Sequence, residues 1–376
     1  MKRSMRILIL GATVLVMALV LTASMAGAAE SQSQTDPAAA SGVTSIQASA
    51  TEQAASSQRW TRAARLAAKP IDVAGITPEQ LAAGLAAMGP AAPSGPPGFV
   101  AGGLPQAGAD AEAQAVYPEE WALAEADAAA VQPDSIAPAG TAGVFTAYYT
   151  NQFAQMWKVY PYRAVGKLFS NAGTCSASVI GTNTIVTAAH CVFDTATNTW
   201  YNNFSFCPAF KNGGCPYGTF SWQQVWIPTA YVNASSFGNA IRWDVAVMQL
   251  NKNSAGKQVQ AVTGWLGRSW NFDYTQLIFT NGYPAAKQAG KFGYMCVAET
   301  FAAGTDIMEM GCNSGPGHSG GPWIKNFTPQ VSGAMNYVNN VMSYYYTSGS
   351  KAGNTMGAAR FSSDNIVVLC NAAPGC

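Results

Sequence analysis

A serine framed by glycines and prolines is the residue of this chain best suited to chemistry. Residues 315–322 read G-P-G-H-S-G-G-P, with Ser319 near the centre. Glycine allows positive φ angles and close approach of other groups, so such a serine can lie on a tight turn with backbone N–H groups free beside it. Its hydroxyl could attack a carbonyl carbon while those N–H groups stabilise the oxyanion. A glycine-rich loop that happens to hold a serine is the alternative, and this stretch alone does not decide between them.

The order of the histidines separates two kinds of nucleophile. Residues 317–321 also fit G-x-S-x-G, the turn of α/β-hydrolases, in which the catalytic histidine follows the serine. The chain has two histidines, His190 and His318, and neither follows Ser319. The order His190, Asp244, Ser319 fits the other arrangement, in which histidine takes the serine proton and aspartate orients the imidazole. Asp244 directly precedes the apolar run V-A-V-M-Q-L, which is a poor position for a solvent-exposed carboxylate.

Three motifs around these residues resemble the chymotrypsin-like serine peptidases. They are T-A-A-H-C at 187–191, W-D-V-A-V-M-Q-L at 243–250 and G-H-S-G-G-P at 317–322. Residues 160–168 (Y-P-Y-R-A-V-G-K-L) and 281–284 (N-G-Y-P) are more similar to the bacterial glutamyl-endopeptidase branch than to trypsin. The resemblance runs from Phe153 to the C-terminus. It implies a serine endopeptidase that acts through an acyl-enzyme, with the N–H groups of Gly317 and Ser319 as the oxyanion hole.

Two departures from the family pattern affect activation and specificity. Trypsin-like enzymes have an aspartate before the serine that binds the newly cut N-terminus, whereas this chain has His318, so we expect activation by removal of a covering propeptide instead. Asn313 stands at the position of trypsin's specificity aspartate, and Ser314 matches a hydroxyl residue of the glutamyl branch. The later strand, for which we take Met335, Asn336 and Tyr337, lacks that branch's histidine. These five residues predict a substrate pocket for an uncharged P1 side chain.

The elements that must position these residues are predicted to be short strands. Residues 175–180 and 184–187 read as a hairpin around the turn residues 181–183, and residues 245–250 as a buried strand. Many short strands with glycine-rich turns indicate an all-β sandwich or barrel fold. The resemblance selects two six-stranded antiparallel β-barrels, at about 155–260 and 261–376, with the catalytic cleft between them.

The first third of the chain is different material. Residues 1–28 have a basic start, an apolar run and an A-x-A site, which predicts a secretory signal peptide; an uncleaved membrane anchor is the alternative. Residues 29–140 are rich in alanine, proline and glycine and hold no cysteine, so we expect a largely disordered propeptide, with short helices possible at 59–68 and 78–88. A flexible secreted linker or stalk is the other reading. The peptidase domain would be residues 141–376.

Charge favours association of these two parts. Residues 29–140 carry 4 Lys/Arg and 12 Asp/Glu (4 − 12 = −8), and residues 141–376 carry 13 and 7 (13 − 7 = +6). Opposite net charges attract, chiefly at low salt. The propeptide is therefore a candidate inhibitor or folding aid of the same chain, which would make the protein a zymogen.

The eight cysteines all lie after Gly173. An even number behind a signal peptide predicts disulfides rather than metal ligands, and we expect no metal and no cofactor. The resemblance implies Cys175–Cys191, and the simplest local pairs for the rest are Cys207–Cys215, Cys296–Cys312 and Cys370–Cys376.

These observations predict a secreted, extracellular serine endopeptidase made as a preproprotein. Its partners would be protein or peptide substrates and its own propeptide, without nucleic acid and without stable membrane insertion once the signal is removed. A catalytically inactive peptidase-like binding protein and a secreted esterase using the same three residues are the alternatives.

Overall fold

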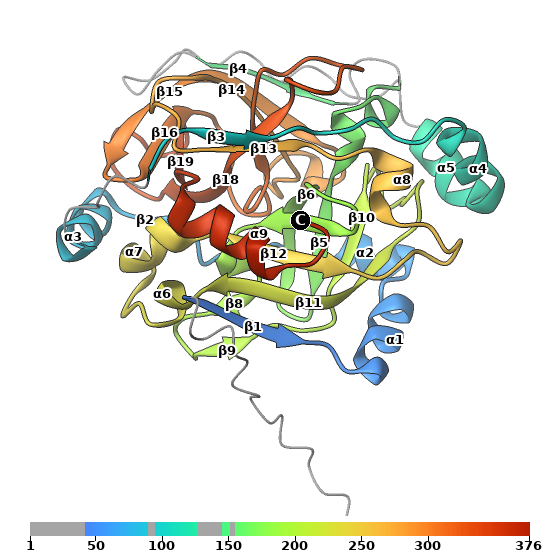
Figure 1. Cartoon of the computed structure of the whole chain (residues 1–376), viewed down its shortest axis with the longest axis horizontal. Coiled ribbons are helices and arrows are strands. Elements are labelled where there is room, and N and C mark those ends of the chain that lie inside the picture. Colours follow the sequence, from blue (N-terminus) through green and yellow to red (C-terminus); the bar gives the residue numbers. More distant parts are fainter. Residues whose placement is uncertain (1–41, 89–94, 127–144, 151–154) are drawn as a thin grey trace, which may run out of the picture. The chain divides into compact units, whose positions relative to one another are not determined.

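The computed structural model describes residues 42–88, 95–126, 145–150 and 155–376 (Figure 1). The predicted signal peptide, residues 1–28, lies outside the described residues. Among the described residues, no helix has both the length and the apolar composition needed to cross a bilayer.

The first barrel is built from six antiparallel strands. They follow the order β11-β10-β5-β6-β7-β12, and pairing of β12 with β11 closes the sheet. The predicted hairpin is confirmed as β6 and β7, and the predicted buried strand as β12. The strands are β5 (Val165–Ser170), β6 (Gly173–Val179), β7 (Thr184–Thr187), β10 (Ser205–Pro208), β11 (Phe220–Pro228) and β12 (Ala246–Leu250).

The second barrel is also six-stranded and antiparallel. Its order is β17-β14-β15-β16-β19-β18, closed by pairing of β17 with β18. The expected two-barrel, all-β fold is therefore confirmed. The strands are β14 (Leu277–Gly282), β15 (Tyr294–Gly304), β16 (Ile307–Gly311), β17 (Pro322–Lys325), β18 (Tyr337–Tyr346) and β19 (Thr355–Ala359).

Short elements connect and flank the barrels. The four expected disulfides are present. The bonds are Cys175–Cys191, Cys207–Cys215, Cys296–Cys312 and Cys370–Cys376. The connecting elements are β8 (Phe193–Asp194), β9 (Thr199–Trp200), α6 (Thr229–Val232), α7 (Phe237–Ala240), α8 (Val259–Thr263), β13 (Gly267–Trp270) and α9 (Val368–Ala372).

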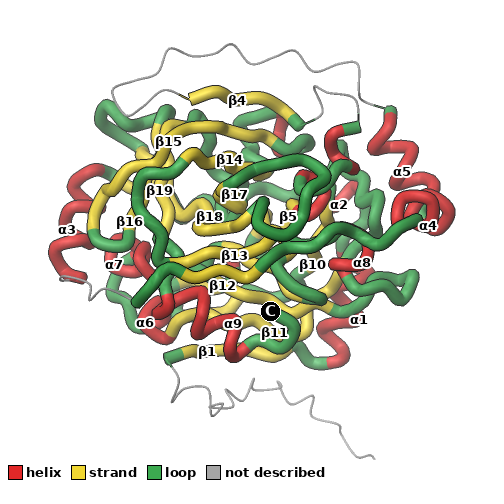
Figure 2. The backbone as a smooth tube through the Cα atoms, turned by 45° about the horizontal axis from the view of Figure 1, so that its top comes forward, coloured by secondary structure: helices red, strands yellow, loops and turns green. Residues whose placement is uncertain are grey.

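The described part of residues 42–126, called the N-terminal segment below, is built from regular elements that pack on both barrels. β1 pairs with β11 and, farther along the chain, β4 pairs with β15 (Figures 1 and 2). β2 pairs with β18 and β3 pairs with β13 (Figure 1). The elements are β1 (Val43–Gln47), α1 (Ala50–Arg59), α2 (Arg62–Ala67), β2 (Gly75–Ile76), α3 (Pro78–Met88), β3 (Gly98–Val100), α4 (Ala109–Val116), α5 (Pro118–Glu125) and, beyond the segment, β4 (Phe145–Tyr149).

The expectation of a largely disordered segment is therefore wrong for these described residues. The segment has too few large apolar side chains for an independent core, but the barrels supply the missing partner. β11 and β18 extend beyond their barrel neighbours β10 and β17, and these extensions pair with β1 and β2, while β3 pairs with β13 outside the barrel. The helix expected at 78–88 is confirmed as α3, with the Thr77 hydroxyl accepting a hydrogen bond from the Gln80 N–H at 3.2 Å and proline at the first helical position. The one expected at 59–68 is confirmed as α2.

Candidate active site

Strand pairing in the first barrel brings His190 and Asp244 together. His190 lies in the 3-10 turn Ala189–Cys191 directly after β7, and Asp244 lies two residues before β12. Because Thr187 of β7 is opposite Ala246 of β12, the two side chains start from neighbouring strand ends. The Asp244 carboxylate accepts two hydrogen bonds from His190: Oδ1 from the backbone N–H at 2.9 Å and Oδ2 from Nδ1 at 2.7 Å. This contact leaves Nε2 as the ring nitrogen available for proton transfer.

Ser343 of β18 makes a third contact with the Asp244 carboxylate. Its hydroxyl donates to Oδ2 at 2.5 Å, and all three residues are buried. A buried carboxylate is costly unless hydrogen-bonded, so these donors explain how Asp244 is tolerated in the core. The sequence prediction missed Ser343. Its only signal is a small hydroxyl residue inside the apolar stretch V-M-S-Y of a strand.

The turn that carries Ser319 is held between elements of both barrels. Ser176 of β6 donates its N–H to the Ser319 carbonyl at 2.7 Å and its hydroxyl to the Gly317 carbonyl at 2.8 Å. On the other side, the Gly320 N–H donates to the Met342 carbonyl at 2.8 Å. Gly320 has φ +76°, and a Cβ there would lie 2.0 Å from the Thr187 hydroxyl. The turn therefore lies against the end of β7, three residues before His190, and beside the residue that precedes Ser343.

The polar atoms expected to react are buried and unpaired. His190 Nε2 and Ser319 Oγ have no hydrogen-bond partner among the described residues. Within that same part of the chain, no acceptor is found for the backbone N–H groups of Gly317 and Ser319. Gly317 has φ +94°, in the region that favours glycine. A free base nitrogen, a free hydroxyl and two free N–H donors are the components that acyl transfer requires.

His318 points away from these atoms. Its Nδ1 contacts the Ser314 hydroxyl at 2.7 Å and its Nε2 the Thr280 hydroxyl at 2.9 Å. Burial lowers the pKa of the His318 imidazole to about 3, so the ring is neutral at ordinary pH. Both ring nitrogens are occupied, which leaves His190 as the available base.

The residues expected in the substrate pocket divide into two groups. Asn313 and Ser314 are half-buried on the loop before the Ser319 turn, and the Asn313 side chain accepts a hydrogen bond from Tyr294. Tyr337 begins β18, five residues before Met342, which corresponds to about 17 Å of strand. The Asn336 side chain donates to the Thr328 and Val331 carbonyls. Along β18, the contact with the Ser319 turn is made by Met342, next to Ser343, rather than by Tyr337.

Residues 69–76, called the covering segment below, run between the two barrels past the candidate site. On the first barrel, the Thr174 N–H donates to the Lys69 carbonyl at 2.9 Å and the Ile71 N–H to the Thr174 carbonyl at 3.1 Å. On the second, the Tyr345 N–H donates to the Ala74 carbonyl at 3.1 Å, and β2 runs parallel to β18.

The middle of the covering segment lies against the wall that holds His190. Val73 borders a cavity of about 260 Å³ together with His190 and Phe237, and Ala74 is completely buried. Val73 also borders a second cavity of about 420 Å³ under α3 and α7. His190 and Ser319 each have 0% exposed surface in this arrangement. Val73, more than 100 residues before His190 in sequence, therefore lines the same cavity as His190.

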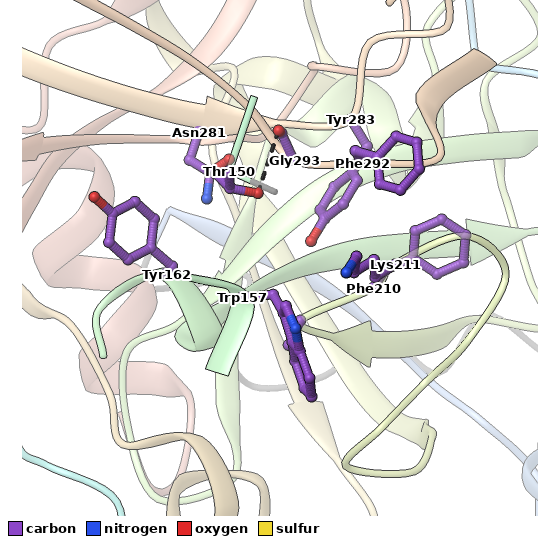
Figure 3. A pocket seen from close by; sticks show the side chains of 10 residues that line it. Thr150, Trp157, Tyr162, Phe210, Lys211, Asn281, Tyr283, Phe292 and Gly293 are labelled. Atoms are coloured by element: carbon purple, nitrogen blue, oxygen red, sulfur yellow. Dashed lines mark hydrogen bonds between the residues drawn. The ribbon is translucent and has the colours of Figure 1, made fainter. Parts of the chain in front are cut away.

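A smaller cavity lies at the junction of the barrels. Figure 3 shows Trp157, Tyr162, Lys211, Asn281 and Tyr283 around it, and its volume is about 10 Å³. That is space for about one water molecule, so it cannot take a substrate side chain. Lys211 is already bonded to the Ala124 carbonyl.

Metal binding at the candidate site has no ligand set to support it. Among the described residues, one group combines ligand types at suitable distances, Cys175, His190 and Cys191. The two sulfurs are joined to each other and His190 Nδ1 contacts Asp244, so these atoms are engaged.

Comparisons with known proteins agree with the fold. A family model described as Trypsin matches residues 151–357. A glutamyl endopeptidase of Bacillus licheniformis is 25% identical over 150 residues, which are 38% of this chain and 44% of the relative. Achelase-1 of Lonomia achelous is 27% identical over 135 residues, 35% of this chain and 57% of the relative. The chain thus matches about half the length of these relatives. A solved Glu endopeptidase superposes with a TM-score of 0.50 at 18% identity, covering 62% of this chain and 98% of the other.

Proposed function

Because the chain belongs to the trypsin family of serine peptidases, with a family match over more than half its length, we propose that it is a secreted serine endopeptidase made with an inhibitory propeptide. The observation that carries the proposal is the pairing of His190 with Asp244 beside a buried, unpartnered Ser319 hydroxyl. Similarity to a glutamyl endopeptidase supports the same reaction class. The four disulfides support an oxidising, extracellular location.

In the proposed reaction each of the three residues has one role. Ser319 Oγ adds to the substrate carbonyl carbon as its proton passes to His190 Nε2, and Asp244 holds the imidazolium through Nδ1–H. The carbonyl oxygen, now negative, accepts hydrogen bonds from the Gly317 and Ser319 N–H groups, whose loss typically costs about 2.7–4 kcal/mol each. The tetrahedral species collapses, the C–N bond breaks, and Nε2 gives its proton to the leaving amine. Water then repeats the sequence on the acyl-enzyme and restores Ser319.

The specificity that best fits the site is for an uncharged P1 side chain. Asn313 and Ser314 carry no charge, and the β18 residues beside the Ser319 turn, Met342 and Ser343, are also neutral. A charged P1 group would find no opposite charge from these residues.

The inhibitory role of the N-terminal segment rests on its contacts with the site. The covering segment bonds to backbone groups of Thr174 and Tyr345 on opposite barrels, and its Val73 lines the cavity that His190 also borders. A substrate chain cannot reach Ser319 while these contacts persist. Release of the segment is therefore the activating step.

Ion pairs support the charge argument for the same association. Asp110 pairs with Arg163 at 2.8 Å, Glu112 with Lys257 at 2.8 Å and Glu125 with Lys158 at 3.9 Å. In each pair the acidic residue belongs to the N-terminal segment and the basic residue belongs to residues 141–376. These carboxylates are about half exposed, so each pair contributes modestly, about 0.2–1 kcal/mol.

An irreversible serine-directed phosphonate separates the three candidate functions. We expect the processed wild-type protein to be labelled and Ser319→Ala to remain unlabelled while folded by circular dichroism. An inactive binding protein would show no labelling at all. A peptide substrate with an uncharged P1 residue, compared with the matched ester, then distinguishes a peptidase from an esterase, which would cleave only the ester.

A further inference from the structure

Besides its backbone hydrogen bonds to Met342 of β18, the turn that carries Ser319 is joined to the second barrel by the side chain of His318. The imidazole reaches from this turn to Thr280 of β14 through Nε2 and to Ser314 of the preceding loop through Nδ1. We propose that His318 is a positioning residue, whose bridge between the Thr280 and Ser314 hydroxyls sets the oxyanion-hole geometry of Gly317 and Ser319. This inference rests on the proposed function, since it assumes that Ser319 is the nucleophile.

The surroundings of the ring leave space for an imidazole in one place. A Cβ on Gly282 would lie 2.5 Å from the His318 ring, and a Cβ on Gly321 would lie 2.7 Å from it. The ring therefore fills a slot between the end of β14 and the turn that follows Ser319. Because His318 lies between Gly317 and Ser319 in the chain, a shift of its backbone that takes the ring out of this slot would also move the two N–H donors.

The bridge works with a neutral ring. A neutral imidazole has one N–H donor and one acceptor nitrogen, and a hydroxyl can serve either role, so both contacts are satisfied whichever nitrogen carries the proton. Thr280 and His318 are completely buried, and Ser314 is half-buried. No charged group is needed to hold the turn.

Independence from a charged partner has a consequence for activation. The oxyanion turn has its free N–H groups and its positive φ at Gly317 while the N-terminal segment is still in place. The two oxyanion donors are therefore free before any peptide bond of the chain is cut, whereas Ser319 Oγ and His190 Nε2 are not hydrogen-bonded to each other in this arrangement.

The test measures kcat and KM of processed protein on a small ester, with His318→Phe, Thr280→Val and the double variant. Phenylalanine fills the slot without hydrogen bonds, and valine keeps the size of threonine and suits a strand. We expect His318→Phe to lower kcat roughly 10- to 100-fold with KM changed less than about twofold, because a misplaced donor weakens transition-state binding. Thr280→Val should lower kcat by several-fold, and in the His318→Phe background it should have no further effect.

The outcomes distinguish this inference from the proposed function. If wild-type protein neither hydrolyses the ester nor reacts with the phosphonate, the proposed function fails. If wild type is active and both single variants keep kcat within twofold, the positioning role is wrong. A change in KM alone, or additive effects in the double variant, would likewise overturn it. Thr280→Val decides the matter if His318→Phe does not fold, because it removes one hydrogen bond at constant volume.

Discussion

Gly84 is the point of closest approach between α3 and α7, and Gly84→Ala should loosen the covering of the active site. A Cβ at this position would lie 2.4 Å from the Gly238 carbonyl oxygen, against 3.4 Å or more for ordinary contact. The obstacle is backbone, so α3 must move by about 1 Å. Overpacking of this kind costs about 1–3 kcal/mol, and the higher helix propensity of alanine recovers about 0.8–1 kcal/mol.

The net cost of roughly 1 kcal/mol converts into a change in access. α3 begins two residues after the covering segment, so its displacement weakens the hold of residues 69–76 on β18. A shift of 1 kcal/mol changes an equilibrium roughly fivefold. We expect the intact Gly84→Ala chain to react with a serine-directed phosphonate about five times faster than intact wild type. Gly84→Leu, which adds further carbons at the same contact, should react faster still.

The assay follows labelling of full-length chain by intact mass, so that processed molecules are counted separately. Ala82→Gln is the matched control, because it changes an exposed position of the same helix to another good helix former. Equal labelling rates for Gly84→Ala and Ala82→Gln would refute the packing argument. Slower labelling of Gly84→Ala would mean that helix propensity outweighs the clash.

Three further outcomes test other parts of the structure. Burial lowers the pKa of His318 to about 3, below the value of about 6.5 in the unfolded chain, so the unfolded state binds more protons between these pH values. The free energy of unfolding therefore decreases as pH falls through this range, by up to about 1.4 kcal/mol per pH unit. In a Ser319→Ala background, the urea midpoint should drop more from pH 7 to pH 4 than it does with His318→Phe added, and equal drops would contradict this. A peptide of residues 42–126 supplied in trans should inhibit the processed enzyme. Salt at 1 M should raise the inhibition constant roughly tenfold, because it screens the three exposed ion pairs. An inhibition constant that does not depend on salt would assign the affinity to strand pairing alone. Ser343→Ala removes a hydrogen bond to the buried Asp244 carboxylate and should lower kcat by roughly tenfold with KM unchanged, since an unmet buried acceptor costs about 1–3 kcal/mol. An unaltered kcat would mean that the two hydrogen bonds from His190 are enough to hold the Asp244 carboxylate.

Local patterns in the sequence predicted the features that depend on local structure. The hairpin of β6 and β7, the strand after Asp244 and the helix starting at Pro78 each have turn or capping residues within a few positions. The disulfides follow from cysteines 6 to 16 residues apart, together with the resemblance for Cys175–Cys191.

Features that depend on residues distant in the chain could not be predicted from the sequence. β1 has five residues and no marked alternation, and it is a strand because β11, more than 170 residues later, extends beyond its barrel neighbour β10 and pairs with it there. Ser343 lies on β18, whose pairing with β19 shifts register between Met342 and Tyr344, and of the pocket residues 335–337 only Tyr337 belongs to that strand. A register shift changes which residues of a strand lie opposite those of the neighbouring strand, and the adjacent sequence does not predict it.

Under the proposed inhibition, the pairing of β1, β2 and β3 with separate strands would make the N-terminal segment a tethered ligand. Joined to the barrels by one chain, it would compete with substrate at an effective concentration in the millimolar range. A cut between segment and barrels would change this from a unimolecular to a bimolecular equilibrium without breaking any of the contacts. Inhibition would then depend on how far the two pieces are diluted. A cut protein that stays concentrated would remain inhibited, and the same protein diluted into a large volume would become active. Dilution after the cut would therefore be the step that activates it.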